Sequence, residues 1–224
     1  MSVWEIVELA RHPQRPYSLD YIRRIAPDFI ELHGDRLSAD DPALVAGIGT
    51  WHGRTTVFLG HQKGRSMKDR VARNWGMMHP EGYRKALRLA HHAAKFGFPI
   101  ISLIDTPGAY PGAGAEERGI AAAIANAIME WFRIPVPIVA AVIGEGGSGG
   151  ALGMGVVEEV VPEPKGSASA NYDAAAEALD EALHRHMRPL LELDASELRQ
   201  HRYDRFRYID SLVHAEPHFG PKID

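Results

Sequence analysis

PIVAAVIGEGGSGGAL, at residues 137–152, is the stretch of sequence that decides the fold. Its first six residues are apolar and predict a buried strand, and its last residues are small and compatible with a helix. Between the two stand five glycines, at positions 144, 146, 147, 149 and 150. Glycine at a strand-to-helix junction lets the backbone turn tightly and brings its N–H groups close to a ligand. We therefore expect this turn to hold a negatively charged oxygen, on a phosphate or on a reaction intermediate.

Upstream of this turn, helix and strand patterns alternate. Residues 82–96 predict a helix, residues 99–105 a strand and residues 116–132 a second helix. These lengths are typical of crossover units, so we expect a parallel sheet covered by helices. A second glycine-rich loop, at residues 106–112, follows the strand at 99–105. Both glycine loops then lie at the carboxyl ends of strands, where such sheets bind ligands, and this coincidence predicts the active site.

The N-terminal residues 1–41 predict two helices. The second is capped by Ser18 and has an apolar face that runs to Leu32, although Pro27 interrupts it. Residues 43–62 then predict a β-hairpin with its turn at His52-Gly53.

The composition changes after residue 156. Residues 157–169 form an acidic, proline-containing linker, and a helix is predicted from Asn171 or Asp173 to about Leu193, with another from Asp194. Residues 210–224 predict a loosely held tail. The domain organisation we expect is an N-terminal helical segment (1–41), a core (42–156), and a linker with C-terminal helices (157–224).

Composition excludes several classes of function. The chain has 224 residues, a net charge of -4 and no cysteine, so disulfides, thiolate nucleophiles and cysteine-bound zinc are absent from it. No apolar run approaches the ~18 residues of a membrane span, and no signal peptide is evident. His91-His92 and His184-x-His186 lack the spacing of a metal-ligand set, so no metal site is predicted. We expect a cytoplasmic protein.

Several interpretations of the glycine turn remain open. Gly146-Gly147-Ser148-Gly149-Gly150 matches the G-x-S-x-G pattern of serine hydrolases, but any serine inside a glycine run does so. Gly144, Gly146 and Gly149 fit G-x-G-x-x-G without the acid that a dinucleotide site needs about 20 residues on. The alternatives are an oxyanion site made of backbone N–H groups, or a tight helix–strand crossing that binds nothing.

Two further features carry charge near the predicted active site. The basic segment at residues 61–70, with Lys63 and Arg65, is compatible with phosphate binding or with a solvated helix face. Asp105 ends the strand before the second glycine loop, where it could cap the loop or the following helix, and we assign it no role as a base.

Taken together, six segments resemble the carboxyltransferase alpha subunit of bacterial acetyl-coenzyme A carboxylase, in the order that family has them. They are residues 12–17, 61–65, 80–89, 105–112, 115–119 and 143–152. The resemblance implies a crotonase-like α/β fold of stacked ββα units with helical N- and C-terminal extensions. It also implies transfer of a carboxyl group from carboxybiotin to acetyl-CoA, which gives malonyl-CoA for fatty-acid synthesis.

The partners implied by the resemblance are a zinc-containing beta subunit in an alpha2beta2 heterotetramer, the biotin carboxyl carrier protein that bears the biotin, and biotin carboxylase. In that chemistry a biotin nitrogen takes the methyl proton of acetyl-CoA, so the protein needs donors for oxyanions rather than a strong base. Carried over by motif, the donors are Gly149 and Gly150. The residues that shape the substrate pocket are Gly108, Ala109, Tyr110, Pro111, Gly112, Gly146 and Gly147, and the basic pair Lys63 and Arg65 is assigned to substrate binding.

The chain departs from the family after residue 156. About 50 residues, or one to two crossover units, have no counterpart near positions 156–158. We therefore keep two alternatives: a non-catalytic paralogue that only assembles with the beta subunit, and a crotonase-like acyl-CoA hydratase or hydrolase.

Overall fold

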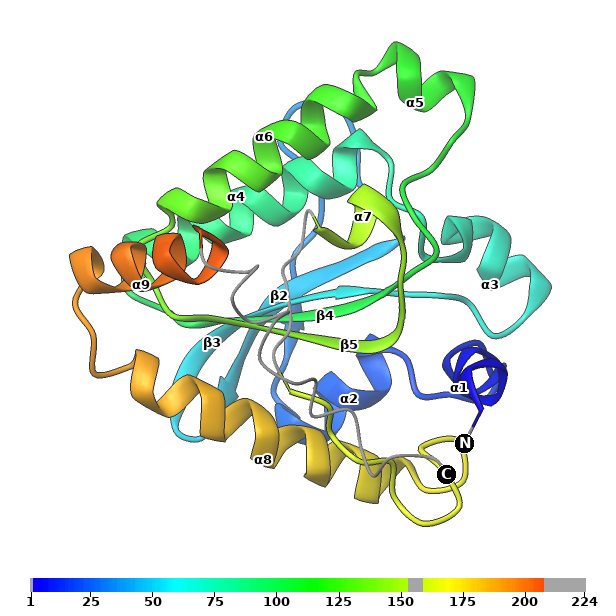
Figure 1. Ribbon diagram of the computed structural model, residues 1–224. Coiled ribbons are helices and arrows are strands. Elements are labelled where there is room, and N and C mark those ends of the chain that lie inside the picture. Colours follow the sequence, from blue (N-terminus) through cyan, green and yellow to red (C-terminus); the bar gives the residue numbers. More distant parts are fainter. Residues whose placement is uncertain (1, 153–158, 208–224) are drawn as a thin grey trace.

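The computed structural model describes residues 2–152 and 159–207 and shows a five-stranded sheet between two layers of helices (Figure 1). The strands lie in the order β1-β2-β3-β4-β5. Their bounds are Ile30–Glu31 (β1), Leu44–Trp51 (β2), Arg54–His61 (β3), Ile100–Thr106 (β4) and Ile138–Gly146 (β5). β1, β2 and β3 pair antiparallel, whereas β3, β4 and β5 pair parallel. The predicted mixed α/β class is confirmed, and the sheet contains the parallel part that the crossover lengths indicated.

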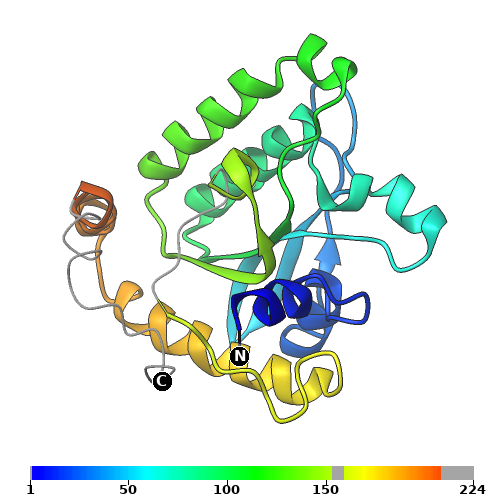
Figure 2. The same cartoon turned by 45° about the vertical axis from the view of Figure 1, so that its right-hand side comes forward.

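Helices cover both faces of the sheet. In Figure 1, α4 and α6 lie above it and α2 and α8 lie below it, an arrangement that the turned view in Figure 2 also shows. α9 packs on α6, α1 contacts β5, and α7 follows the glycine turn. The helix bounds are Val3–Ala10 (α1), Ser18–Ile25 (α2), Met67–Ala72 (α3), Asn74–Gly76 (the 3-10 helix η1), Pro80–Phe96 (α4), Ala113–Glu117 (α5), Ile120–Arg133 (α6), Ser148–Leu152 (α7), Tyr172–Leu190 (α8) and Ala195–Arg207 (α9).

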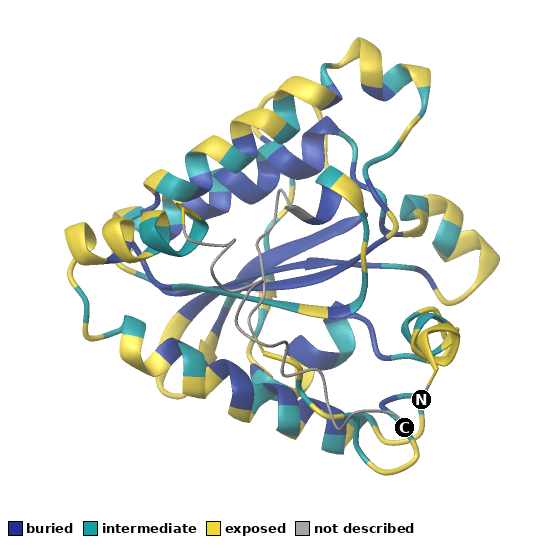
Figure 3. Ribbon diagram, in the orientation of Figure 1, coloured by how far each residue is buried: buried dark blue, intermediate teal, exposed yellow. Residues whose placement is uncertain are grey.

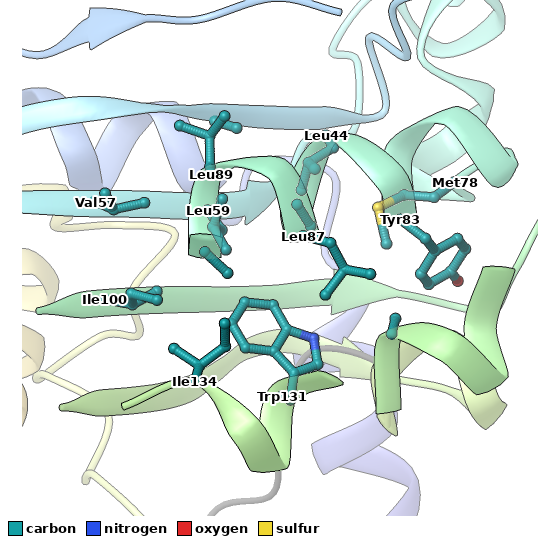
Figure 4. Packing of buried hydrophobic residues seen from close by; sticks show 14 of the residues in the cluster. Leu44, Val57, Leu59, Met78, Tyr83, Leu87, Leu89, Ile100, Trp131 and Ile134 are labelled. Atoms are coloured by element: carbon teal, nitrogen blue, oxygen red, sulfur yellow. The ribbon is translucent and has the colours of Figure 1, made fainter. Parts of the chain in front are cut away.

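The sheet divides the hydrophobic core in two because successive side chains of a strand point to opposite faces. Ile100 and Ile104 of β4 pack toward α4 and α6, where Trp131 fills the space between helix and sheet (Figure 4). Ile101 and Leu103 pack toward α2 and α8. All seven residues of β4 are buried, as expected of a central strand with helices on both faces (Figure 3).

The hairpin at residues 43–62 is confirmed. His52 and Gly53 both have positive φ, of 45° and 74°, which is the backbone of a primed two-residue turn. The turn lies at the end of the sheet where β3 begins. The carboxyl ends of β3, β4 and β5 lie at the opposite end of the sheet, because these strands are parallel.

Among the predicted boundaries that differ from the structure, three concern the surroundings of the glycine loops or the topology of the sheet. The second N-terminal helix ends at Ile25 and does not reach Leu32, because Pro27 disfavours helical backbone at Ala26, and Ile30–Glu31 pairs with β2 as a strand. The helix predicted over 116–132 is split into α5 and α6 at Gly119, which has a φ of 76°. The strand predicted to end at 143 continues into the glycine run.

The terminal segments complete the layer below the sheet. α2 comes from the predicted N-terminal segment and α8 from the predicted C-terminal one, and they pack against each other and against the sheet. Asn171 caps α8 through a hydrogen bond from the N–H of Ala174, 3.0 Å long. The boundaries at 41 and 156 stay predictions, and the tail predicted at 210–224 lies outside the described residues.

Candidate functional site

The end of β5 carries a bulge that shapes the glycine turn. Between two matched pairs, Ile104 with Val142 and Thr106 with Gly146, β4 advances two residues while β5 advances four. Inside the bulge, the N–H of Glu145 donates to Asp105 Oδ1 over 2.9 Å, so a side chain replaces the usual backbone acceptor. The N–H of Gly147 then donates to the carbonyl of Thr106, also over 2.9 Å. Bulges of this kind redirect the chain at the end of a strand.

Three glycines of the turn have no room for a side chain. A Cβ at Gly144 would lie 2.3 Å from Asp105 Oδ1, one at Gly147 would lie 2.2 Å from the Pro107 carbonyl oxygen, and one at Gly150 would lie 2.7 Å from the Ala109 nitrogen. The turn therefore packs directly on the loop at 106–112. The structure brings together the two glycine loops, as the sequence predicted.

The N–H groups at the start of α7 are not used by the sheet. The N–H groups of Glu145 and Gly147 donate to β4, and the first bond of α7 runs from the N–H of Ala151 to the Gly147 carbonyl over 3.2 Å. The N–H groups of Ser148, Gly149 and Gly150 precede that bond, and the first N–H groups of a helix have no acceptor within it. Gly146 and Ser148 are exposed, so the turn faces solvent.

Local contacts hold the loop at 106–112 in place. The Thr106 hydroxyl donates to the Gly108 carbonyl over 2.7 Å and accepts from the Gly108 N–H over 3.1 Å. The N–H of Tyr110 donates to the Met78 carbonyl, and the Tyr110 ring lies 4.2 Å from that of His79. A Cβ at Gly112 would lie 2.4 Å from the Tyr110 ring. The loop is thus a fixed wall beside the turn.

Beneath the glycine turn lies a network of charged side chains. Lys63 Nζ is 2.7 Å from Asp105 Oδ1 and 2.6 Å from Glu145 Oε2, and Arg11 Nε is 2.6 Å from Glu145 Oε1. Burial raises the pKa of Asp105, and the charge of Lys63 opposes this. Partial burial acts to raise the pKa of Glu145, but the hydrogen bonds from Lys63 and Arg11 outweigh it and the pKa is lowered.

Sequence reasoning missed Glu145 and left Asp105 without a role. A signal was available: Lys63, Asp105 and Glu145 each stand at or just beyond the end of one of three strands predicted near one another. Without the register of the strands, however, the contacts between them are not visible.

Arg65 lies in a separate cluster. It pairs with Asp20 over 2.5 Å, and its guanidinium lies 4.7 Å from the centre of the Tyr17 ring and 5.5 Å from that of Tyr172. Lys63 and Arg65 therefore both have carboxylate partners within the chain. Their assignment to substrate binding stays a prediction.

Ser148 lacks the surroundings of a hydrolase nucleophile. Its φ of 60° does resemble a strained strand-to-helix turn. Among the described residues, however, no hydrogen bond joins its hydroxyl to a histidine or a carboxylate. The centres of the His184 and His52 rings are 4.3 Å apart, at the end of the sheet where β3 begins. Ser148 lies at the opposite end, beyond the carboxyl end of β5. His214 and His218 lie outside the described residues.

Two surface hollows lie at the edge where β3 begins. One, of about 460 Å³, is lined by residues that include Arg24, His52 and Asp180, and the other, of about 290 Å³, lies between Trp51 and Arg188. Neither contains the glycine turn. Over residues 2–152 and 159–207 there is no cluster of histidines and carboxylates that could hold a metal ion, and no helix long and apolar enough to cross a bilayer.

A family model described as acetyl co-enzyme A carboxylase carboxyltransferase-like matches residues 1–160 and 153–210. Similar proteins include acetyl-coenzyme A carboxylase carboxyl transferase subunit alpha of Anoxybacillus flavithermus, 41% identical over 268 aligned positions that cover 97% of this chain and 82% of the relative. The same subunit of Synechocystis is 46% identical, over 92% of this chain and 79% of the relative. Since 97% of 224 residues is about 217, about 50 of the 268 aligned positions have no counterpart in this chain.

Solved structures of similar fold include transcarboxylase 12S, with a TM-score of 0.54 and 21% identity over 67% of this chain and 28% of the other. The beta subunit of geranyl-CoA carboxylase of P. aeruginosa gives a TM-score of 0.52 at 20% identity, over 69% of this chain and 27% of the other. These likenesses concern the fold, and they confirm the predicted crotonase-like architecture. The family match and the sequence identities together show that the chain belongs to the family of acetyl-coenzyme A carboxylase carboxyltransferase alpha subunits.

Proposed function

We propose that the chain is the alpha subunit of an acetyl-CoA carboxyltransferase, which moves a carboxyl group from carboxybiotin to acetyl-CoA. The observation that carries the proposal is that only some N–H groups of the glycine turn bond to the sheet. Those of Glu145 and Gly147 donate to β4, and those of Gly149 and Gly150 belong to the first turn of α7, where N–H groups have no acceptor within the helix. Fixed backbone donors of this kind stabilise negative charge that develops on an oxygen during reaction.

The residues present fit an oxygen-bearing substrate at this place. A Cβ built on Gly149 meets no atom closer than Ile124 Cγ2 at 3.8 Å, so there is space above the backbone there. Bound carboxybiotin supplies the carboxyl group and, once CO2 is released, a basic nitrogen. The chain itself contributes the donors of Gly149 and Gly150. Gly146, Gly147 and the wall from Gly108 to Gly112 shape the pocket.

The proposed partners are the beta subunit and the biotin carboxyl carrier protein, with biotin carboxylase supplying carboxybiotin, in an alpha2beta2 assembly. The exposed position of the glycine turn supports this, because a site that must exclude water needs cover from another surface. We also propose that the chain lacks about 50 residues near positions 156–158, where the two matched segments of the family model meet.

Carboxyl transfer between malonyl-CoA and free biotin, measured with the chain and a beta subunit mixed, tests the proposal. Gly149→Val is expected to keep the fold, since a Cβ there meets no atom closer than 3.8 Å, and to place methyl groups where we propose that the substrate oxygen approaches. It is expected to lower kcat by about a hundredfold, comparable to the loss of one oxyanion donor. Ser148→Ala is the matched control and is expected to retain activity.

The same assay separates the alternatives. Activity of the chain without any beta subunit, together with a large loss in Ser148→Ala, would instead support a hydratase or hydrolase. Stable binding to the beta subunit with no carboxyl transfer would support the assembly-only paralogue. We keep this alternative because we propose that the chain lacks about 50 residues of the family.

A further inference from the structure

We propose that Lys63, Asp105 and Glu145 are positioning residues, and that their shared network sets the direction of the N–H groups at the start of α7. Asp105 and Glu145 lie at the ends of β4 and β5, and Lys63 lies two residues beyond the end of β3. Asp105 Oδ1 accepts both from Lys63 Nζ, at 2.7 Å, and from the N–H of Glu145, at 2.9 Å. This role deepens the proposed function, on which its kinetic test rests.

Asp105 produces the bulge because it competes with the backbone of its own strand. A regular ladder would pair residue 105 with β5 through backbone groups alone. Here the carboxylate of Asp105 accepts from the N–H of Glu145, and the Thr106 carbonyl accepts from the N–H of Gly147, the first residue after β5. These two bonds fix where β5 stops and where α7 begins. A Cβ at Gly144 would overlap the same carboxylate, so the backbone is pressed directly onto Asp105.

The network is balanced in charge. Two carboxylates, Asp105 and Glu145, face two cations, Lys63 and Arg11. The side chains of Asp105, Lys63 and Glu145 are 2%, 14% and 16% exposed, so water screens them little. Removing one partner of a buried ion pair leaves the other charge uncompensated, which distorts the structure around it. None of the three supplies an N–H group of α7, so the role proposed for them is indirect, through the turn. For Lys63 this role is an alternative to the substrate binding expected from the sequence.

The kinetic test measures kcat and KM for malonyl-CoA in the transfer reaction with the beta subunit. Asp105→Asn and Lys63→Met are expected to lower kcat about tenfold or more with KM changed less than about threefold, because misplaced donors weaken the transition state more than substrate binding. The double variant is expected to be less impaired than Lys63→Met alone, since no buried charge is stranded. Lys63→Arg is expected to recover part of kcat.

Asp180→Asn is the matched control. It makes the same change in a carboxylate at the opposite edge of the sheet, where Asp180 accepts from Trp51 and contacts His52. Its kcat is expected to equal that of the unchanged chain. A purely structural loss would lower the amount of folded protein and leave kcat per folded molecule unaltered.

A second readout needs no activity. In chain labelled with 15N-glycine, Asp105→Asn is expected to shift the amide signals of Gly144, Gly147, Gly149 and Gly150, but not that of Gly97 at the end of α4. Unchanged signals for the turn, or an unchanged kcat, would overturn the positioning role. If the unchanged chain shows no transfer with a beta subunit while Asp105→Asn still moves these signals, the proposed function fails and the positioning role stands.

Discussion

Gly149 and Gly150 are adjacent, yet the structure gives them different freedom. A Cβ at Gly150 would lie 2.7 Å from both the Ala109 nitrogen and the Gly108 carbonyl carbon, whereas one at Gly149 has its nearest neighbour at 3.8 Å. We predict that Gly150→Ala lowers the free energy of unfolding by about 1–3 kcal/mol, because the loop at 106–112 must move. Gly149→Ala, its control, should be neutral or slightly stabilising, since alanine favours a helix. Urea denaturation of both variants checks this, and equal losses would contradict it.

His61 provides a prediction about pH. It is fully buried at the end of β3, and burial lowers its pKa from 6.5 to about 3. Between these values the unfolded chain binds a proton that the folded chain does not. Stability therefore falls as the pH drops below about 6.5, by up to about 1.4 kcal/mol per pH unit from this group.

Unfolding free energies measured from pH 7 to pH 4 check this prediction, with His61→Leu as the variant that removes the slope. Asp40, whose pKa is lowered to about 2 despite partial burial because it pairs with Lys85, loses its contribution below about pH 5 in both proteins, so the difference between the two slopes isolates His61. An equal slope in both proteins would show that His61 does not titrate in this way.

At the scale of elements, one carboxylate of α8, that of Asp180, bonds directly to the hairpin. Asp180 accepts from the indole N–H of Trp51 over 2.5 Å and lies 2.9 Å from His52 Nε2. Trp51 is 2% exposed, so Asp180→Ala leaves a buried donor without an acceptor, and we predict a loss of about 1–3 kcal/mol in unfolding free energy. Asp173→Ala on the same helix removes an ion pair with Arg24 in which Asp173 is 87% exposed, and little change is expected. Guanidinium titrations of both variants measure their free energies of unfolding. Similar values would contradict the role of Asp180 as the acceptor that the Trp51 N–H needs.

Elements with a clear apolar pattern were predictable from the sequence. Elements that form only because a neighbouring strand pairs with them were not. The hairpin, β4 and α4 follow from apolar runs and from the turn at His52-Gly53. β1 was missed because two residues carry no period, and its strand state depends on β2 next to it.

The candidate site divides in the same way. The close packing of the two glycine loops could be predicted from their glycine content, since only glycine permits such close packing. The contacts of Lys63, Asp105 and Glu145 depend on the register of three strands. A shift of one residue would turn Asp105 to the other face of the sheet.

At the scale of the whole molecule, β5 forms one edge of the sheet over residues 2–152 and 159–207. The carbonyl of Pro137 accepts from the N–H of Ile100, so by alternation the backbone groups of residues 138, 140 and 142 point away from β4. β5 is the last strand among the described residues, and its Val142 is 42% exposed. An apolar edge of this kind normally pairs or is covered. About 50 aligned positions of the Anoxybacillus relative have no counterpart in this chain, and we propose that in the family this segment covers the edge of β5.

We predict that inserting the corresponding segment of the Anoxybacillus relative between residues 156 and 159 raises the midpoint of thermal unfolding by about 5 °C, because it pairs the edge of β5. A glycine-serine insertion of equal length is the control and should not raise it. Calorimetry of the two proteins checks the prediction. Equal midpoints would mean that the edge gains nothing from the family segment.

The network of Lys63, Asp105 and Glu145 also has a consequence for folding. Lys63 and Glu145 are 82 residues apart in the chain, and Asp105 is 40 from Glu145, so they meet only after two crossovers have closed. Bringing such distant residues together costs loop-closure entropy before their contacts can form. A chain in which β5 has not yet paired with β4 lacks the bond between Asp105 and the N–H of Glu145. We therefore expect the proposed anion site to form only when β5, the last of the described parallel strands in chain order, joins the sheet.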